Sequence, residues 1–321
     1  IYNSLTPEQQ AVVDEAGQKA VEYERYLNRA GDDEIKSRWT NENGVTITAY
    51  EDIDIDSFKT AVDGVDEWYV EQLESQGFEV TYLQPDKDGR ITADTLKAAL
   101  RPDTILVSIM MVNNEVGSVM PIAQMAKLTH KLSPDALFHT DAVQGFLKLP
   151  FTPPTLGADL VTVSAHKIHG PKGVGALYIS PYMIKRRAVS PIIFGGGQEF
   201  SFRSGTENLP GIAGFGAAAA AQSASLEQDI AAMTDLRDKL PAMLADDPIL
   251  SNIAVNVPQS KERAPHIVSL RMPKIKSETM LNFLSGKGIA VSSGSACSAQ
   301  SGRISSALLC FGLSEAEADT T

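Results

Sequence analysis

The stretch Val163–Ile179 reads VSAHKIHGPKGVGALYI and connects one apolar run to another. The first run stops at His166 and Lys167, and three glycines follow, at Gly170, Gly173 and Gly175. Glycine permits both tight turns and close approach of the backbone to a ligand. The glycines therefore predict a tight hairpin into the second run, a nearby ligand, or both. Lys172 is expected to be a solvated turn residue, whereas Lys167, at the end of a buried strand, indicates a chemical role.

Strand-like and helical patterns alternate around this stretch. The strand-like runs cover 78–83, 104–112, 136–142, 159–165 and 174–179. Helical patterns lie near 93–100 and 121–132. Apolar, β-branched runs separated by amphipathic helices are typical of βαβ units and of a mostly parallel sheet covered on both faces. The sequence therefore predicts an α/β fold.

A second group of elements follows. An Ala-rich helical stretch runs from about 210 to 244, with strand-like runs at 253–257, 266–272 and 289–293 and helices near 277–285 and 303–311. These elements predict a second, smaller α/β domain. We expect the large domain to cover residues 70–245 and the small one residues 246–321.

The first 69 residues have a different character. A helix that opens at the capping sequence TPEQ (6–9) extends to about Trp39, the run VTITAY (45–50) alternates like a strand, and a second helix starts near Asp56. This segment contains no histidine, cysteine or glycine-rich loop. It is expected to serve as a helical packing surface.

Composition narrows the class of protein. The 321 residues are 43% hydrophobic and 21% charged, which is typical of globular proteins with about two domains. A net charge of −12 argues against binding to nucleic acid or to an anionic membrane. No apolar run is long enough to span a bilayer, and no leader peptide is recognisable. With only two cysteines, the sequence favours reduced thiols in a cytoplasmic protein, and nothing indicates a metal site.

Polar residues follow three of the predicted strands. In open parallel sheets, ligands bind beyond the carboxyl ends of the strands. The polar residues at these ends are Asn114 after the first strand, Asp141 and Gln144 after the second, and Ser164, His166 and Lys167 after the third. An aspartate at a strand end is more often only a helix cap. Three neighbouring strand ends that carry amide, carboxylate and amine groups together predict a binding site.

The residue types at this edge favour one cofactor. A carboxylate can keep a pyridine nitrogen protonated, and a neighbouring lysine can form a Schiff base with an aldehyde. Asp141 and Lys167 are the combination that pyridoxal 5′-phosphate (PLP) requires. Ser164 and His166 can donate hydrogen bonds to its phosphate.

The two cysteines lie in different surroundings. Cys297 belongs to the run SSGSACS (292–298), whose small residues predict an accessible loop in which a thiol can ionise and react. The alternative is an incidental loop cysteine. Cys310 belongs to the apolar run SSALLCFG and is expected to pack inside a helix face and to be inert.

Together these motifs resemble one enzyme family. Residues 70–321 resemble the cysteine desulfurases, PLP enzymes of fold type I with a large and a small domain. The matching motifs are VNNEVG (112–117), HTDAVQ (139–144), SAHKIHGPKGVGALYI (164–179), GGGQE (195–199), RSGTEN (203–208) and SSGSACS (292–298). The SGSAC form resembles the subgroup with a long cysteine loop that supplies sulfur for iron–sulfur cluster assembly.

The resemblance implies a role for each site residue. By this resemblance, Lys167 is the lysine that holds PLP and moves the substrate Cα proton. Cys297 is the nucleophile that takes sulfur from L-cysteine, so that alanine is released and a persulfide remains on Cys297. The implied cofactor contacts are Asp141 to the pyridine nitrogen, Gln144 and Asn114 to the ring-oxygen region, Ser164 and His166 to the phosphate, and Thr206 to the phosphate of the other subunit. A cytoplasmic homodimer that serves an iron–sulfur scaffold or another sulfur acceptor is therefore implied.

The sequence also departs from this family. A member is expected to begin with a phosphate loop and a histidine that stacks on the cofactor ring, and to end with an arginine that binds the substrate carboxylate. Instead, residues 1 to about 68 resemble the C-terminal tail of solute-binding proteins of TRAP dicarboxylate transporters. The alternative function is thus an impaired or inactive chimeric relative, or a binding-protein fragment joined near residue 70 to a partial enzyme domain.

Overall fold

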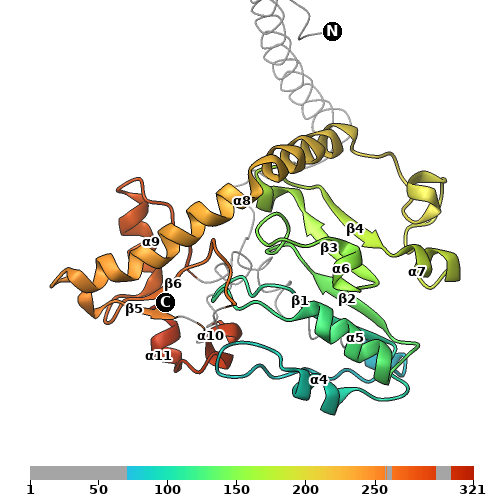
Figure 1. Ribbon diagram of the computed structural model, residues 1–321, viewed down its shortest axis with the longest axis horizontal. Helices are drawn as coiled ribbons and strands as arrows, with labels where there is room; N and C mark the ends of the chain where they lie inside the picture. The colour runs from blue at the N-terminus through green and yellow to red at the C-terminus, as the bar shows by residue number, and fades with distance from the viewer. Residues whose placement is uncertain (1–70, 257, 259–261, 294–304) are drawn as a thin grey trace, which may run out of the picture. The chain divides into compact units, whose positions relative to one another are not determined.

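The computed structural model describes residues 71–256, 258, 262–293 and 305–321 (Figure 1). All of them belong to one compact unit, residues 64–321. The helices and the strand predicted before residue 70 lie outside the described residues, as does Cys297.

The centre of this unit is a four-stranded sheet in the order β1 (Leu106–Met110), β2 (Leu137–Asp141), β3 (Leu160–Ser164) and β4 (Gly175–Ile179). The first three strands run parallel, and β4 is antiparallel to β3. The predicted α/β fold with a mostly parallel sheet is therefore confirmed.

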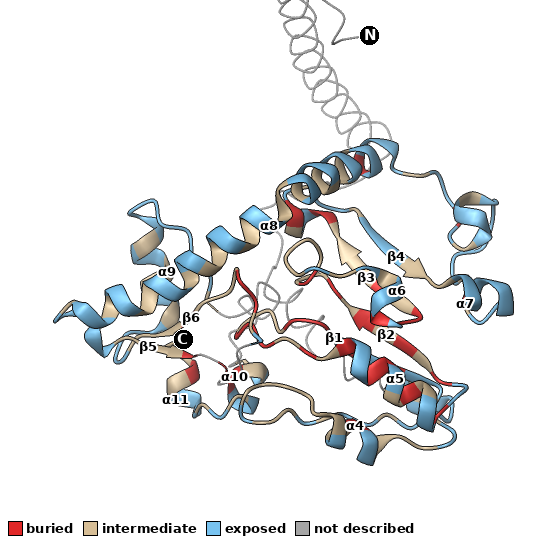
Figure 2. Cartoon of the chain, viewed as in Figure 1, coloured by how far each residue is buried: buried red, intermediate tan, exposed pale blue. Residues whose placement is uncertain are grey.

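The strands alternate between a buried and an open face. Val107, Ile109, Phe138 and Val161 are all buried and face the main hydrophobic core, which Figure 2 shows in red over β1, β2 and α5 (Ile122–Leu132). Their sequence neighbours point to the other face, where Leu106, Ser108 and Met110 of β1 are exposed. Because side chains in parallel strands alternate with a period of two, this open face also carries Asp141 and Ser164.

A buried carboxylate connects three of these elements. Asp159, just before β3, is only 6% exposed. Its Oδ2 accepts hydrogen bonds from the backbone N–H of Phe138 in β2 and from Nε2 of His130 in α5, both at 2.8 Å. Asp159 thereby fixes the start of β3 against β2 and the helix that covers them.

The remaining elements of this part lie around the sheet. They are α4 (Ala93–Ala99), α6 (Pro153–Leu156), the 3-10 turn η3 (Ala165–Ile168), α7 (Pro181–Arg186), the 3-10 turn η4 (Gln198–Ser201) and α8 (Leu209–Asp246). The long helix α8 begins at Asn208, whose side chain accepts from the N–H of Gly211. Among the described residues, no helix is both long and apolar enough to cross a membrane.

The C-terminal elements surround a second, two-stranded sheet. It consists of β5 (Ala254–Asn256) and β6 (Ser269–Arg271), which are antiparallel. Around it lie the 3-10 turn η5 (Leu250–Asn252), α9 (Ser277–Ser285), α10 (Ser306–Cys310) and α11 (Glu315–Ala318).

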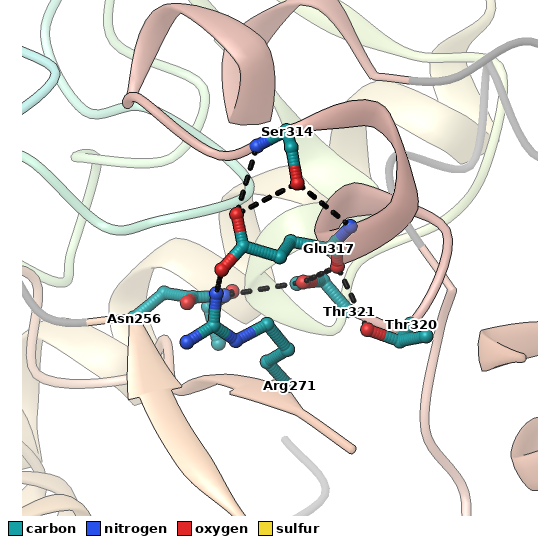
Figure 3. Close-up of polar contacts among 7 residues, drawn as sticks. Asn256, Arg271, Ser314, Glu317, Thr320 and Thr321 are labelled. Atoms are coloured by element: carbon teal, nitrogen blue, oxygen red, sulfur yellow. Dashed lines mark hydrogen bonds and ion pairs between the residues drawn. The ribbon is translucent and has the colours of Figure 1, made fainter. Parts of the chain in front are cut away.

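A polar cluster ties α11 to this small sheet (Figure 3). The carboxylate of Glu317 pairs with Arg271 and accepts from the N–H and hydroxyl of Ser314, and these hydrogen bonds lower the pKa of Glu317. Thr321 donates to the carbonyl of Glu317 and contacts Nδ2 of Asn256 at 3.3 Å. The end of the described chain is therefore part of the folded unit.

Two predicted strands are wrong. Residues 78–83 and 289–293 contain no strand, although their sequences are strand-like. Large apolar side chains of both segments are exposed, including Tyr82 at 65% and Ile289 at 52%. A strand is stabilised by a hydrogen-bonded neighbour, and neither segment has one among the described residues.

The outer edge of β1 is open. Within the described residues, β1 is the last strand of its sheet on that side. A cavity of about 580 Å³ separates this edge, 105–110, from the segment 77–83.

The prediction that Cys310 packs inside a helix face is also wrong, because Cys310 is exposed. The helix α10 has only five residues, and Leu308, which is 2% exposed, is the side chain that packs inwards. A residue two positions further along a helix points roughly to the opposite side.

Candidate active site

The carboxyl ends of β1, β2 and β3 meet at one edge of the sheet, as predicted. In the register, Asp141 at the end of β2 lies beside Met110 of β1 and Thr162 of β3. Ser164 ends β3 two residues after Thr162, on the same face. The structure thus brings together Asp141 and Ser164, with Lys167 one short turn further on.

Asp141 has one carboxylate oxygen available for a ligand. Its Oδ1 accepts from the N–H of Val143 at 2.9 Å, whereas Oδ2 has no hydrogen-bond partner in the described part of the chain. The backbone carbonyl of Asp141 accepts from the N–H of Met111 at 2.7 Å and fixes the strand end. A positioned carboxylate with a vacant oxygen fits a protonated pyridine nitrogen.

The basic residues after β3 lie on the turn η3. The hydroxyl of Ser164 and Nδ1 of His166 are 2.7 Å apart, and His166 is exposed. Lys167 is partly buried and forms no hydrogen bond or ion pair with any residue that the structure describes. A lysine amine without such a contact is available to react with a carbonyl compound.

The glycines belong to a hairpin, as expected, but the hairpin is not tight: β3 and β4 pair antiparallel, and their connection, 165–174, contains the turn η3. The N–H of Ala165 donates to the carbonyl of Val174, and Gly173 has a φ of +78°. At Gly175, a Cβ atom would lie only 2.7 Å from the carbonyl oxygen of Val163. The exposed Lys172 lies in the turn, as expected for a solvated residue.

The loop after β1 brings in a residue that the sequence interpretation missed. Gly117, with a φ of +77°, accepts a hydrogen bond from the N–H of Ala264 at 2.8 Å, and a Cβ atom there would lie 3.2 Å from the Cβ of Ile267. This close approach docks the segment 264–267 against the loop. As a result, Nε2 of His266 lies 3.3 Å from Oε1 of Gln144.

His266 is held in its neutral form. Burial, followed by the positive charges of Lys148 and Lys167, lowers the pKa of His266 from 6.5 to about 4. Its Nδ1 atom is buried without a hydrogen-bond partner among the described residues. The influence of Lys167 also shows that His266 belongs to the neighbourhood of the candidate site.

This low pKa predicts a loss of stability in acid. An unfolded histidine takes up a proton below about pH 6.5, whereas His266 in the folded protein does so only near pH 4. Between these values the unfolded state binds more protons, so the free energy of unfolding is expected to fall by about 3 kcal/mol as the pH drops from 6.5 to 4. Urea unfolding of the wild type and of His266→Gln across this pH range measures how much His266 contributes to the pH dependence of the free energy of unfolding. An identical pH dependence in both proteins would contradict the prediction.

Asn114 and Ser292 line a cavity next to His266. This cavity has a volume of about 450 Å³, and most of its walls are apolar. After the undescribed segment 294–304, the chain resumes at Ser305, whose hydroxyl donates to Oε2 of Glu115 at 2.5 Å. On the far side of the Cys297 segment, Ser305 therefore contacts the loop that carries Asn114, and before the segment Ser292 lines the same cavity as Asn114.

The remaining predicted site residue lies elsewhere. Thr206 is exposed on the loop before α8, where its carbonyl accepts from Arg203. No described contact joins Thr206 to Asp141, Ser164 or Lys167. Its predicted role toward another subunit stays a prediction.

Known proteins share this architecture. Residues 68–310 match the family model described as aminotransferase class-V. A cysteine desulfurase IscS of Dictyoglomus turgidum is 42% identical over 229 residues, which is 71% of this chain and 56% of that protein. A putative cysteine desulfurase IscS 1 of Bacillus subtilis is 44% identical over 234 residues, which is 72% of this chain and 59% of that protein.

Solved structures agree with these matches. A NifS-like protein superimposes with a TM-score of 0.68 at 35% identity, covering 78% of this chain and 63% of its own. DndA from Streptomyces lividans gives a TM-score of 0.62 at 34% identity, covering 78% of this chain and 68% of its own. The chain spans little more than half the length of the two curated relatives. From the family match and the shared fold it follows that the chain belongs to the aminotransferase class-V family, whose members depend on PLP.

Proposed function

We propose that the protein is a cysteine desulfurase, which removes sulfur from L-cysteine to give L-alanine and a persulfide on Cys297. The observation that carries this proposal is the meeting of Asp141, Ser164 and Lys167 at one edge of the sheet. The names of the similar proteins from Dictyoglomus turgidum and Bacillus subtilis point to the same activity.

The residues at the strand ends fit PLP. The vacant Oδ2 of Asp141 would accept from the pyridinium N–H, and Ser164 and His166 would bind the phosphate. Gln144 and Asn114 would contact the ring-oxygen region. When bound, PLP supplies an electron sink for the bond-breaking at the substrate.

Two residues of the chain would carry the reaction. The amine of Lys167 holds the cofactor aldehyde and moves the proton at the substrate Cα. The thiolate of Cys297 attacks the substrate sulfur, the carbon–sulfur bond breaks, and the sulfur remains on Cys297. L-cysteine and one protein thiol thus become L-alanine and one protein persulfide, with no other reactant.

The proposal extends to assembly and partners. By resemblance, we infer a cytoplasmic homodimer in which Thr206 reaches the phosphate of the other subunit, and an iron–sulfur scaffold or another sulfur acceptor that takes the persulfide sulfur. We also infer a large domain at 70–245, a small domain at 246–321, and a segment at 1–69 that resembles a TRAP solute-binding-protein tail.

The binding of PLP tests the proposal. Purified protein titrated with PLP is expected to develop a visible absorption band that depends on Lys167. Lys167→Ala should abolish the band, because Lys167 is the lysine on the turn that directly follows β3. Lys172→Ala is the matched control, because Lys172 is exposed in the adjacent turn, and it should keep the band. A band that is unchanged in Lys167→Ala would overturn the assignment.

A further inference from the structure

The contact between His266 and Gln144 joins distant parts of the chain. It pairs Nε2 of His266 with Oε1 of Gln144 at 3.3 Å, across 122 residues of sequence. We propose that His266 is a positioning residue, a proposal that rests on the function proposed above. The Nε2–H of His266 fixes the Gln144 amide so that its NH₂ group, a hydrogen-bond donor, faces the ring oxygen of the cofactor.

The protonation of His266 supports this orientation. A neutral imidazole has one N–H, and the carbonyl oxygen of an amide can only accept. The proton therefore lies on Nε2, where it donates to Oε1 of Gln144. The charged groups that act on His266 are Lys148 and Lys167, and both oppose a second proton.

The unpartnered Nδ1 atom agrees with this role. A buried acceptor without a donor costs about 1–3 kcal/mol, and such atoms call for an explanation. The atom is left without a partner because the ring is oriented for the contact at Nε2. The hydrogen bond between Gly117 and Ala264 holds the backbone beside His266 in this position.

The orientation of the Gln144 amide matters because Gln144 lies within the proposed cofactor site. Gln144 lies three residues after Asp141, the residue proposed to bind the pyridine nitrogen. With Oε1 occupied by His266, the amide presents donors to the rest of the site, and donors stabilise negative charge on an oxygen. If the amide were free to turn over, its oxygen could face the ring oxygen instead and repel it.

The first test uses the protein without PLP. In protein labelled with ¹⁵N-histidine, the His266 signal, assigned by its absence in His266→Gln, is expected to show the Nε2–H tautomer at neutral pH. A signal from the Nδ1–H tautomer would overturn the proposal.

The second test follows the pH midpoint of the Lys167-dependent band. Without a fixed donor at the ring oxygen, the protonated form of the chromophore formed by Lys167 and PLP should persist to higher pH. His266→Leu is therefore expected to raise the pH midpoint of the band by about one unit, which corresponds to the loss of one hydrogen bond to a charged group. His266→Gln keeps an N–H that can reach Gln144, so its midpoint should stay close to that of the wild type. His169→Asn is the matched control, because His169 is exposed at a φ of +64°, which asparagine tolerates.

A double-mutant cycle shows whether His266 acts through Gln144. In a Gln144→Ala background, His266→Leu is expected to cause no further shift of the midpoint. An equal shift in both backgrounds, or no shift in the single variant, would overturn the proposal. Absence of the band from the wild type would instead reject the proposed function, so the two failures are distinguishable.

Discussion

Replacement of Cys297 by serine is expected to abolish the release of sulfide and alanine from L-cysteine in the presence of PLP and a reductant. A serine hydroxyl cannot accept sulfur, and loss of a covalent nucleophile lowers turnover by on the order of a thousandfold or more. The measurement is alanine formation by the wild type and by Cys297→Ser at equal PLP occupancy.

Cys310→Ser is the matched control for this experiment. Cys310 is exposed, with its Sγ 4.0 Å from Oε1 of Gln84, so alkylating reagents are expected to modify it. Accessibility alone does not make a thiol the nucleophile, and Cys310→Ser should retain turnover. Turnover that survives Cys297→Ser but not Cys310→Ser would contradict the assignment. No turnover in any of the three proteins would favour an inactive relative.

Asp159→Ala is expected to lower the free energy of unfolding by about 4 kcal/mol. The substitution leaves the buried N–H of Phe138 without an acceptor and removes the hydrogen bond to His130. A buried donor without a partner costs about 2 kcal/mol, and a hydrogen bond to a charged group contributes about the same. Urea denaturation of the wild type and the variant measures the difference.

Asp159→Asn separates the two contributions. Its amide oxygen can still accept from the N–H of Phe138, while the charge is lost, so about half of the effect is expected. His130→Ala removes only the helix contact and should behave similarly. A loss below 1 kcal/mol in Asp159→Ala would show that Asp159 does not hold β2, β3 and α5 together.

Much of the site could be predicted because it depends on local sequence. Apolar runs mark the parallel strands, and residues that follow such strands must meet at one edge of the sheet. Asp141 and Ser164 occupy these positions, and the glycines after Lys167 belong to the antiparallel connection from β3 to β4. None of these inferences required knowledge of distant contacts.

The errors arise where contacts are distant. His266 lies in a run whose pattern predicts only a strand, and its approach to Gln144 depends on Gly117 in another loop. The runs 78–83 and 289–293 have strand-like sequences, but a strand also needs a neighbour, which a single-sequence pattern cannot supply. Cys310 illustrates the same limit, because the length and direction of α10 decide which of its side chains are exposed.

The open edge of β1 affects how the protein behaves at high concentration. Among the described residues no further strand pairs with this edge, and on the open face of β1 Leu106 and Met110 are 51% and 39% exposed. Such edges recruit strands from other molecules and promote aggregation. The protein is therefore expected to form β-rich aggregates during storage at high concentration. Ser108→Lys, on the exposed face of β1, should slow this aggregation.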